Sequence, residues 1–442
     1  MPESIAPAPF ALRGAALTFK GDPFCIADAM HYESDALVAV ANGRITHFGA
    51  ASNVATLLPP GTPIRDVGRD QLILPGFIDC HAHYPQMQII GAHGEQLLDW
   101  LEKYTFVAEQ QFADPAHARR IAGLFLDECL RQGTTTVASF CTVHAHSVDA
   151  FFEAAEARGM RTIAGKCLMD RNSPEALRDT ARRGYDESKA LIDRWHDRGR
   201  AGYAITPRFA PSSTPEQMEL AGALWKERPG TWLQSHVSEN QREVAWAREL
   251  FPRCRDYLDV YASFGQLGPR AIYGHGVHLT ESELARLHDT GTALAHCPTS
   301  NMFLGSGLLN IGNVKKSGRP VRVGLATDVG AGTSLSMLKT LGAAYATAQL
   351  CGHSLAAPEA FYLATRGAAQ ALYLDDRIGS IAPGFEADLI VLDFKSTPLI
   401  TTRMELCESF EEALFVQMTL ADERAVVATF VAGREITAAG GR

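Results

Sequence analysis

The stretch FIDCHAHYPQ, residues 77–86, places two histidines one residue apart directly after an apolar run. Residues i and i+2 of a β-strand point to the same side, so a strand that ends here directs His81 and His83 toward one face. Cys80 and Ala82 are then expected to face the opposite way. Two converging imidazoles are a potential pair of metal ligands. Isolated histidines are also common in cores and on surfaces, so this prediction depends on partners elsewhere in the chain.

Short apolar segments alternate with amphipathic helical patterns through residues 73–374. The candidate strands are LILPGFIDCHAH, TTTVASF, RTIAGKCL, YAITPRFAP, WLQSHVSE, AIYGHGVHL, ALAHCPTSN and VRVGLATDVG. Eight units of a strand followed by a helix predict an α/β fold, a (β/α)8 TIM-type barrel. A doubly wound open sheet is the alternative. It is disfavoured because no GxGxxG motif follows the first strand.

The two ends of the chain have a different, β-rich texture. Near the N-terminus, Asn42-Gly43 between two apolar runs is a strong hairpin signal, because both turn positions need positive φ. The C-terminal segments GSIAPGFEADLIVLDF and RAVVATFVAGREI are also β-rich. We therefore expect residues 1–72 and 375–442 to form one small β-sandwich domain beside the barrel of residues 73–374.

Composition restricts the class of protein. The 442 residues include 46% hydrophobic and 21% charged residues, as in ordinary globular proteins, and the net charge of -9 argues against binding to nucleic acid. We expect no secretory signal and no membrane-spanning segment, since the N-terminus lacks a basic region and no apolar run approaches ~20 residues. Nine scattered cysteines without a CxxC pair indicate reduced thiols and a cytoplasmic protein.

Polar residues follow several of the predicted strands, where the catalytic groups of such barrels lie. These are His81 and His83 after strand 1, Arg208 after strand 4, His236 after strand 5, His275 after strand 6 and Asp328 after strand 8. His236 and Asp328 add a third imidazole and a carboxylate to the pair formed by His81 and His83. Three neutral imidazoles and one carboxylate suit a single zinc or ferrous ion and leave a position for water.

Other histidines receive weaker assignments. His275 is expected to contact the bound water or the metal, and His278 to be structural. His296 is left open between a structural role and the pocket. His144 and His146 form a second HxH pair, but they follow strand 2 without an evident third ligand, so we expect them to be solvated or at the pocket edge.

Lys166 raises the question of a second metal, because a carbamylated lysine bridges the ions of some binuclear sites. It falls on strand 3, and the proposed ligand set is complete without it. A mononuclear site with a structural Lys166 is the prediction.

Several segments resemble the metal-dependent amidohydrolase superfamily: PGFIDCHAH, QSHVSEN, YGHGVHL, HCPTSN, LATDVG and the C-terminal GSIAPGFEADLIVLD. Within it, HYPQ (83–86), LLDWLEKYTF (97–106), CLMDRN (167–172) and ITPRFAP (205–211) resemble the guanine deaminase family. The resemblance covers nearly the whole chain. One departure is Val107, where that family often has a proline, which concerns the conformation of this expected lid and not the metal site.

The resemblance implies hydrolysis of guanine to xanthine and ammonia by a metal-bound hydroxide, in purine catabolism or salvage. It also implies one Zn²⁺ per subunit, although the same ligands accept Fe²⁺, and a homodimer. Hydrolytic deamination needs a group that moves protons from water to the ring and to the leaving amine. Glu239, three residues after His236, is the candidate shuttle. Asp328 can accept the water's hydrogen, and His275 can hydrogen-bond the developing charge.

Substrate selection needs groups that complement a guanine edge. A guanidinium matches the adjacent acceptors O6 and N7, which makes Arg208 the candidate, and Gln86 offers both a donor and an acceptor. Phe209 can stack on the purine. Trp100 and Tyr104 have helical spacing, so at least one is expected in the core. The complete predicted substrate-binding set is His83, Gln86, Arg208, Phe209, Glu239 and Asp328.

Three alternatives stay open or are set aside. The same ligand set serves deaminases of other purines, pyrimidines and triazine-like rings. A cytidine-deaminase-type site is suggested by His93-Gly94-Glu95, but the P-C-x-x-C that it also needs is absent. A non-catalytic scaffold with the same barrel is the remote alternative, disfavoured because every candidate ligand and the shuttle are present.

Overall fold

The computed structural model describes residues 8–94 and 96–436. Its centre is a parallel sheet in the order β14-β13-β12-β11-β10-β8-β7-β6, with β9 added beside β10. The strands are β6 (Phe77–His83), β7 (Thr134–Phe140), β8 (Arg161–Gly165), β9 (Cys167–Leu168), β10 (Ala201–Pro207), β11 (Trp232–Val237), β12 (Ala271–His275), β13 (Ala293–His296) and β14 (Arg322–Leu325). Sequential strands are neighbours throughout, which confirms the predicted (β/α)8 barrel.

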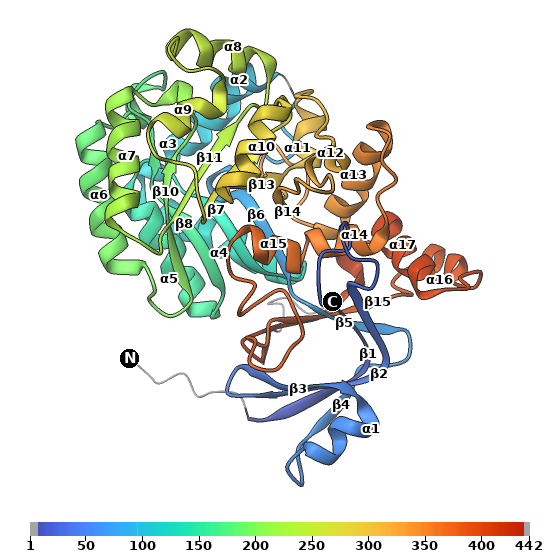
Figure 1. Cartoon of the computed structure of the whole chain (residues 1–442). Coiled ribbons are helices and arrows are strands. Elements are labelled where there is room, and N and C mark those ends of the chain that lie inside the picture. Colours follow the sequence, from blue (N-terminus) through green and yellow to red (C-terminus); the bar gives the residue numbers. More distant parts are fainter. Residues whose placement is uncertain (1–7, 95, 437–442) are drawn as a thin grey trace.

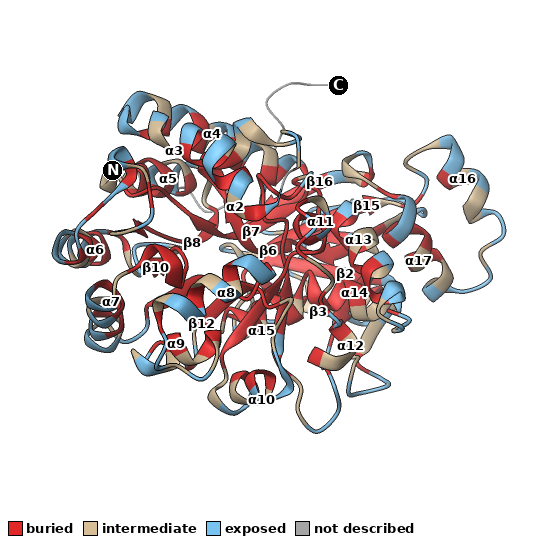
Figure 2. Cartoon of the chain, turned by 90° about the horizontal axis from the view of Figure 1, so that it is seen from above, coloured by how far each residue is buried: buried red, intermediate tan, exposed pale blue. Residues whose placement is uncertain are grey.

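Helices surround these strands and bury one face against them (Figures 1 and 2). They are α4 (Pro115–Arg131), α5 (Ala145–Arg158), α6 (Ala181–Trp195), α7 (Pro215–Glu227), α8 (Gln241–Leu250), α9 (Tyr257–Ser263), α10 (Glu281–Thr290), α11 (Pro298–Phe303), α12 (Ile311–Val314), α13 (Met337–Leu350), α14 (Ala357–Leu363) and α15 (Arg366–Ala371). Their starts have chemical causes. Asp114 caps α4 ahead of Pro115, and Thr280 with Glu283 forms a capping box on α10.

The barrel closes between its first strand and the segment that follows its last. The backbone N–H of Asp328 donates to the carbonyl oxygen of His81 at 2.9 Å, and that of His83 donates to Val329 at 2.6 Å. The buried Asp79 carboxylate accepts from both the N–H and the hydroxyl of Thr327. The seam of the barrel therefore runs directly beside the histidine pair.

One local expectation for β6 is wrong. Cys80 packs with Ile78 and Ala138 in the inner cluster of the barrel, where its Sγ contacts the carbonyl oxygen of Ala368 on α15, whereas Ala82 faces outward as expected. The pairing of β6 with β7 is irregular between Asp79 and Ala82. A bulge inserts an extra residue into the alternation, so Cys80 and the later histidines share the inner side.

Both ends of the chain contribute to a second sheet, in the order β17-β16-β15-β5-β1-β2-β3, with β4 pairing beside β1 (Figure 1). Its strands are β1 (Phe10–Phe19), β2 (Met30–Ala41), β3 (Arg44–Ala50), β4 (Ile64–Asp66), β5 (Gln71–Pro75), β15 (Leu389–Asp393), β16 (Val426–Val431) and β17 (Arg434–Glu435). Asn42 and Gly43 form the expected hairpin turn, with φ of 52° and 75°.

The structure refines the first predicted strand at Gly76. LILP belongs to β5 of the terminal sheet, and FIDCHAH belongs to β6 of the barrel. A side chain at Gly76 would meet Thr135, since a Cβ there would lie 2.2 Å from its Oγ1. The domain limits stay a prediction, and residues 1–7 and 437–442 lie outside the described part.

Further helical segments lie outside the barrel's main helices. They are α1 (Ala51–Val54), α2 (Leu97–Trp100), α3 (Phe106–Gln110), α16 (Pro398–Met404), α17 (Phe410–Leu420), a π-helical turn η3 (Leu101–Thr105), and the 3₁₀ turns η1 (Ala55–Leu57), η2 (Tyr84–Ile89), η4 (Gln111–Ala113), η5 (Glu175–Leu177), η6 (Ala210–Ser212) and η7 (Glu423–Ala425). α16 and α17 interrupt the C-terminal β segment, which the sequence alone did not indicate. No helix among the described residues has the length and apolarity to cross a membrane.

Candidate metal and substrate site

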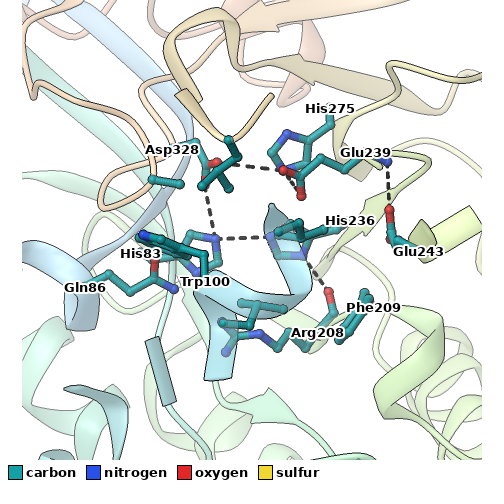
Figure 3. Close-up of a pocket in the computed structure, with 14 residues that line it drawn as sticks. His83, Gln86, Trp100, Arg208, Phe209, His236, Glu239, Glu243, His275 and Asp328 are labelled. Carbon is teal, nitrogen blue, oxygen red and sulfur yellow. Dashed lines mark hydrogen bonds and ion pairs between the residues drawn. The ribbon is translucent and has the colours of Figure 1, made fainter. Parts of the chain in front are cut away.

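Imidazole and carboxylate groups from four strand ends converge at one end of the barrel (Figure 3). Nε2 of His83 lies 3.2 Å from Nε2 of His81 and 3.1 Å from Nε2 of His236. Oδ1 of Asp328 lies 3.3 Å from Nε2 of both His81 and His83. The structure therefore brings the four predicted ligands together.

His275 also reaches this group. One ligand atom each from His81, His236, His275 and Asp328 lies within 4.8 Å of the others. Nε2 of His275 lies 3.8 Å from Oδ2 of Asp328 and 3.4 Å from Oε2 of Glu239. It is thus close enough to contact either a cation or a water molecule bound between the two carboxylates.

Contacts behind two of the rings orient them for a metal ion. Nδ1 of His236 lies 2.6 Å from the carbonyl oxygen of Arg208, which only accepts, so Nδ1 carries the hydrogen and Nε2 keeps its lone pair. Nδ1 of His275 lies 2.9 Å from Oδ1 of Asn301. Nε2 of His275 is buried and has no hydrogen-bond partner among the described residues. The arrangement fits a divalent metal, because metal-bound histidines usually donate their other ring nitrogen in this way.

The backbone is strained where the ligands meet. His275 and Asp328 have φ of 71° and 50°, values that residues other than glycine rarely adopt. Such conformations cost about 1–3 kcal/mol each and cluster at functional sites. The hydrogen bond from Asp328 N–H to His81 is one contact that holds this conformation.

Burial controls the charges in the site. It lowers the pKa of His83 to about 4, which leaves the ring neutral and available as a ligand at neutral pH. Burial opposes ionisation of Asp328, but hydrogen bonds from His81 and His83 hold the pKa of that carboxyl well below its usual range. Burial and the nearby charge of Asp328 raise the pKa of Glu239 to about 8. The two carboxyl groups therefore differ in their tendency to hold a proton, as an acid–base role requires.

A second glutamate fixes the position of Glu239. The buried Glu243 carboxylate accepts hydrogen bonds from the N–H groups of Glu239, at 2.8 Å, and of Asn240, at 3.2 Å, and from the hydroxyl of Tyr257. The Ser306 hydroxyl donates to Oε1 of Glu239 at 2.9 Å. The Glu239 side chain is thereby held beside His275.

A small pocket opens beside the converging group. It is lined by His83, Gln86, Leu97, Trp100, Leu101, Arg208, Phe209, His236, Glu239, Glu243, His275, Leu304, Asp328 and Ala331. The predicted substrate residues Gln86, Arg208 and Phe209 are all present. The segment α2–η3 supplies Trp100 to the wall, whereas Tyr104 packs in the adjacent apolar cluster.

The remaining singled-out residues lie elsewhere. Nε2 of His278 contacts the carbonyl of Ser306 at 2.8 Å, and Nε2 of His146 contacts that of Phe112. His296 is buried, but it does not line the pocket. Lys166 is buried and pairs with Asp179. Glu95, part of the H-x-E that was set aside, lies outside the described residues.

Sequence reasoning missed Glu109, Glu243, Asn301 and Ser306. Glu243 had a usable signal, since Asn240 and Glu243 form a capping box immediately after the strand that carries His236. Asn301 falls in the HCPTSN segment already noted. Glu109 and Ser306 carry no local pattern that distinguishes them from ordinary helix and loop residues.

Comparison with known proteins agrees with this geometry. The sequence matches the amidohydrolase family over residues 72–436, and the chain therefore belongs to that family.

Among its curated relatives, guanine deaminase from Escherichia coli (strain K12) is 48% identical over 93% of each chain, and a probable guanine deaminase from Deinococcus radiodurans is 40% identical over 95% of this chain and 97% of its own. The solved structure of E. coli guanine deaminase matches with a TM-score of 0.94 and 47% identity over 97% of this chain and 99% of that chain. The structure of guanine deaminase from C. acetobutylicum, with bound guanine in its active site, matches with a TM-score of 0.87 and 28% identity over 97% of this chain and all of that chain. These similarities confirm the resemblance to guanine deaminases within the family.

Proposed function

We propose that the protein is a guanine deaminase, a hydrolase that converts guanine and water to xanthine and ammonia at a single divalent cation. The observation that carries this proposal is the placement of Arg208 and Gln86 in the same pocket as the converging histidines and Asp328. The similarity to guanine deaminases over nearly the whole chain supports the choice of guanine.

His81, His83, His236 and Asp328 would hold the cation, with His275 beside it. Three nitrogens and one carboxylate oxygen suit Zn²⁺, and Fe²⁺ accepts the same set. Such an ion would lower the pKa of a bound water to roughly 7 and so supply a nucleophile at neutral pH. Every other step of the reaction falls to the side chains of the protein.

The chemistry places a C–O bond where a C–N bond was. Water oxygen bonds to the ring carbon that carries the amino group, and the amino nitrogen leaves as ammonia. Glu239 takes a proton from the water and delivers protons to the ring nitrogen and the leaving amine, which its raised pKa favours. Asp328 would accept a hydrogen bond from the remaining O–H and then its proton, which reaches the leaving amine through Glu239. His275, with its Nδ1–H on Asn301, lies beside the same oxygen.

The pocket accounts for the orientation of the base. Arg208 presents donors to the acceptor edge of guanine, and Phe209 offers an aromatic ring for a purine face, where stacking contributes about 1–3 kcal/mol. Adenine has an amino group in place of O6 and would leave these buried donors unpaired. Sites of this kind can discriminate by 10⁴–10⁵-fold.

The test is ammonia release from guanine, adenine and cytosine, each with and without a chelator. We expect release from guanine alone, its loss on chelation and its recovery on adding Zn²⁺. Preference for another ring would assign the protein to a different deaminase or hydrolase of the same family. Release that is unaffected by thorough chelation would refute the metal site.

Three further parts of the proposal rest on the family resemblance. They are one Zn²⁺ per subunit, a homodimer, and a cytoplasmic role in purine catabolism or salvage. Metal analysis of purified protein and light scattering on a size-exclusion column test the first two. Growth on guanine as nitrogen source, with and without the gene, tests the third.

A further inference from the structure

Glu109, on α3, contacts both residues proposed to recognise the base. Its carboxylate accepts from Nη1 of Arg208 with both oxygens, at 2.9 and 2.7 Å, and from Nε2 of Gln86 at 3.1 Å. All three side chains are buried, with exposed fractions of 1% for Glu109, 3% for Arg208 and 2% for Gln86. This carboxylate is buried and contacts both recognition residues. Its removal is therefore expected to have a larger effect than the removal of a surface ion pair.

We propose that Glu109 is a positioning residue that sets which hydrogen-bonding groups Gln86 and Arg208 present to the base, and thereby selects a purine with an oxygen at C6. This inference rests on the proposed guanine deaminase function and names the source of its selectivity. Glu109 does not line the pocket, so it acts through its two partners and not by contacting the substrate.

The polarity of Gln86 follows from the chemistry of the carboxylate. An ionised carboxylate only accepts hydrogen bonds, so the amide atom facing Glu109 must be the nitrogen. Oε1 of Gln86 faces the opposite group, the N–H of Gly330, at 3.4 Å. The amide nitrogen has two hydrogens, and Glu109 uses one of them. The second remains as a donor for an acceptor on the purine.

Arg208 is held from two sides by the same helix, α3. Its Nη1 is occupied by Glu109, and its guanidinium carbon lies 5.6 Å from the centre of the Phe106 ring. Burial opposes the charge, but Glu109 keeps the pKa of Arg208 above its ordinary value. The remaining guanidinium N–H groups therefore stay charged donors in a fixed orientation, which suits an oxygen acceptor better than an amino group.

Glu109→Gln tests this inference, because it keeps size and removes the charge and the acceptor-only character. The assay compares kcat/KM for guanine with that for 2-aminopurine, which has the same leaving amine but no oxygen at C6. If turnover of 2-aminopurine is too slow to follow, its inhibition constant against guanine replaces it. We expect kcat/KM for guanine to fall about 10- to 100-fold, as for other residues that orient a ligand-binding group, while the 2-aminopurine constant stays unchanged.

Matched variants separate selectivity from a loss of structure. Glu412→Gln removes a carboxylate on α17 that pairs with Arg403 on α16. This change should leave the constants for guanine and for 2-aminopurine unchanged. Glu109→Asp keeps the buried charge but shortens its reach, so it should fold and lose only part of the preference for guanine. Metal content and the thermal unfolding midpoint are measured for every variant.

An equal loss for both purines would show that Glu109 supports only the structure and would overturn the inference. A Glu109→Gln enzyme with wild-type kinetics on guanine would do the same. If that variant fails to fold, Glu109→Asp decides by the same ratio of the two constants. A wild-type protein that releases no ammonia from guanine would refute the proposed function itself, which is a separate outcome.

Discussion

The carbonyl oxygen of Arg208 lies 2.6 Å from Nδ1 of His236. The strands explain this contact, because the residue after Arg208, Phe209, forms a parallel β-bridge with His236 where β10 and β11 end. Arg208 therefore orients a proposed metal ligand through its backbone while its side chain lines the substrate pocket. Side-chain and backbone roles at this position can be separated by mutation.

Arg208→Ala removes the side chain and keeps the carbonyl. We expect metal content to stay at the wild-type level, while kcat/KM for guanine falls steeply. We also expect the free energy of unfolding to drop by about 3–5 kcal/mol, because Glu109 is left as a buried charge without a cation. Metal analysis and urea unfolding measure the two effects. Arg403→Ala, in a partly exposed pair with Glu412, is the control and should cost less than about 1 kcal/mol. Loss of metal in Arg208→Ala would contradict the separation of roles.

Glu239→Gln keeps the shape of the proposed proton shuttle but cannot take up a proton. We expect kcat to fall about 10²–10⁴-fold, the usual contribution of a general acid–base group, with metal content unchanged. Steady-state ammonia release and metal analysis are the measurements. Glu249→Gln, at an exposed position on the neighbouring α8, serves as the control. A near wild-type rate in Glu239→Gln would remove this assignment.

Gly274→Ala adds one methyl group next to a proposed ligand. A Cβ at this position would lie 2.7 Å from Cε1 and 3.1 Å from Nε2 of His81, so the imidazole must move. We expect reduced metal per subunit and a matching loss of turnover. Gly123→Ala on α4 is the control, because its Cβ would meet only the end of Arg158, at 3.6 Å. That change should keep the metal, and helix propensity predicts stability that is unchanged or up to about 1 kcal/mol higher. Full metal occupancy in Gly274→Ala would show that His81 has room to adjust.

Glu386 should make stability depend on acid pH. It joins the C-terminal segment to the barrel through ion pairs with Arg161 and Arg200. Burial opposes ionisation, but the two guanidinium groups hold the pKa of Glu386 below its ordinary value of 4.5.

The sign of the effect follows from that direction. A carboxyl group that is more acidic in the folded state stabilises it above pH 4.5, and this contribution disappears as the pH falls from 4.5 through the lower folded value. Glu386→Gln should therefore lower the free energy of unfolding at pH 7, and its difference from wild type should shrink below pH 4.5. Urea unfolding across this range tests it, with Glu249→Gln as the control. A difference that grows on acidification would reverse the assigned direction.

Much of the barrel and its site could be predicted from local patterns. Apolar segments of strand length that alternate with amphipathic helices define the (β/α)8 order. In that order the residues after the strands share one end of the barrel. Position in the repeat was therefore enough to group His81, His83, His236, His275, and Asp328. Burial and hydrogen-bond partners then explain their protonation, which no sequence pattern reports.

The sequence by itself determined which residue types stand at the strand ends, because strand and helix periodicities are local properties of the chain. Only the tertiary structure decided that Cys80 turns inward, since a bulge depends on how β6 pairs with its neighbour. It also decided the contact of Glu109 with Arg208, which are 99 residues apart. The physical reason is that a buried carboxylate takes whatever donors the packing of its helix brings within hydrogen-bond reach, and that packing is a property of the whole fold.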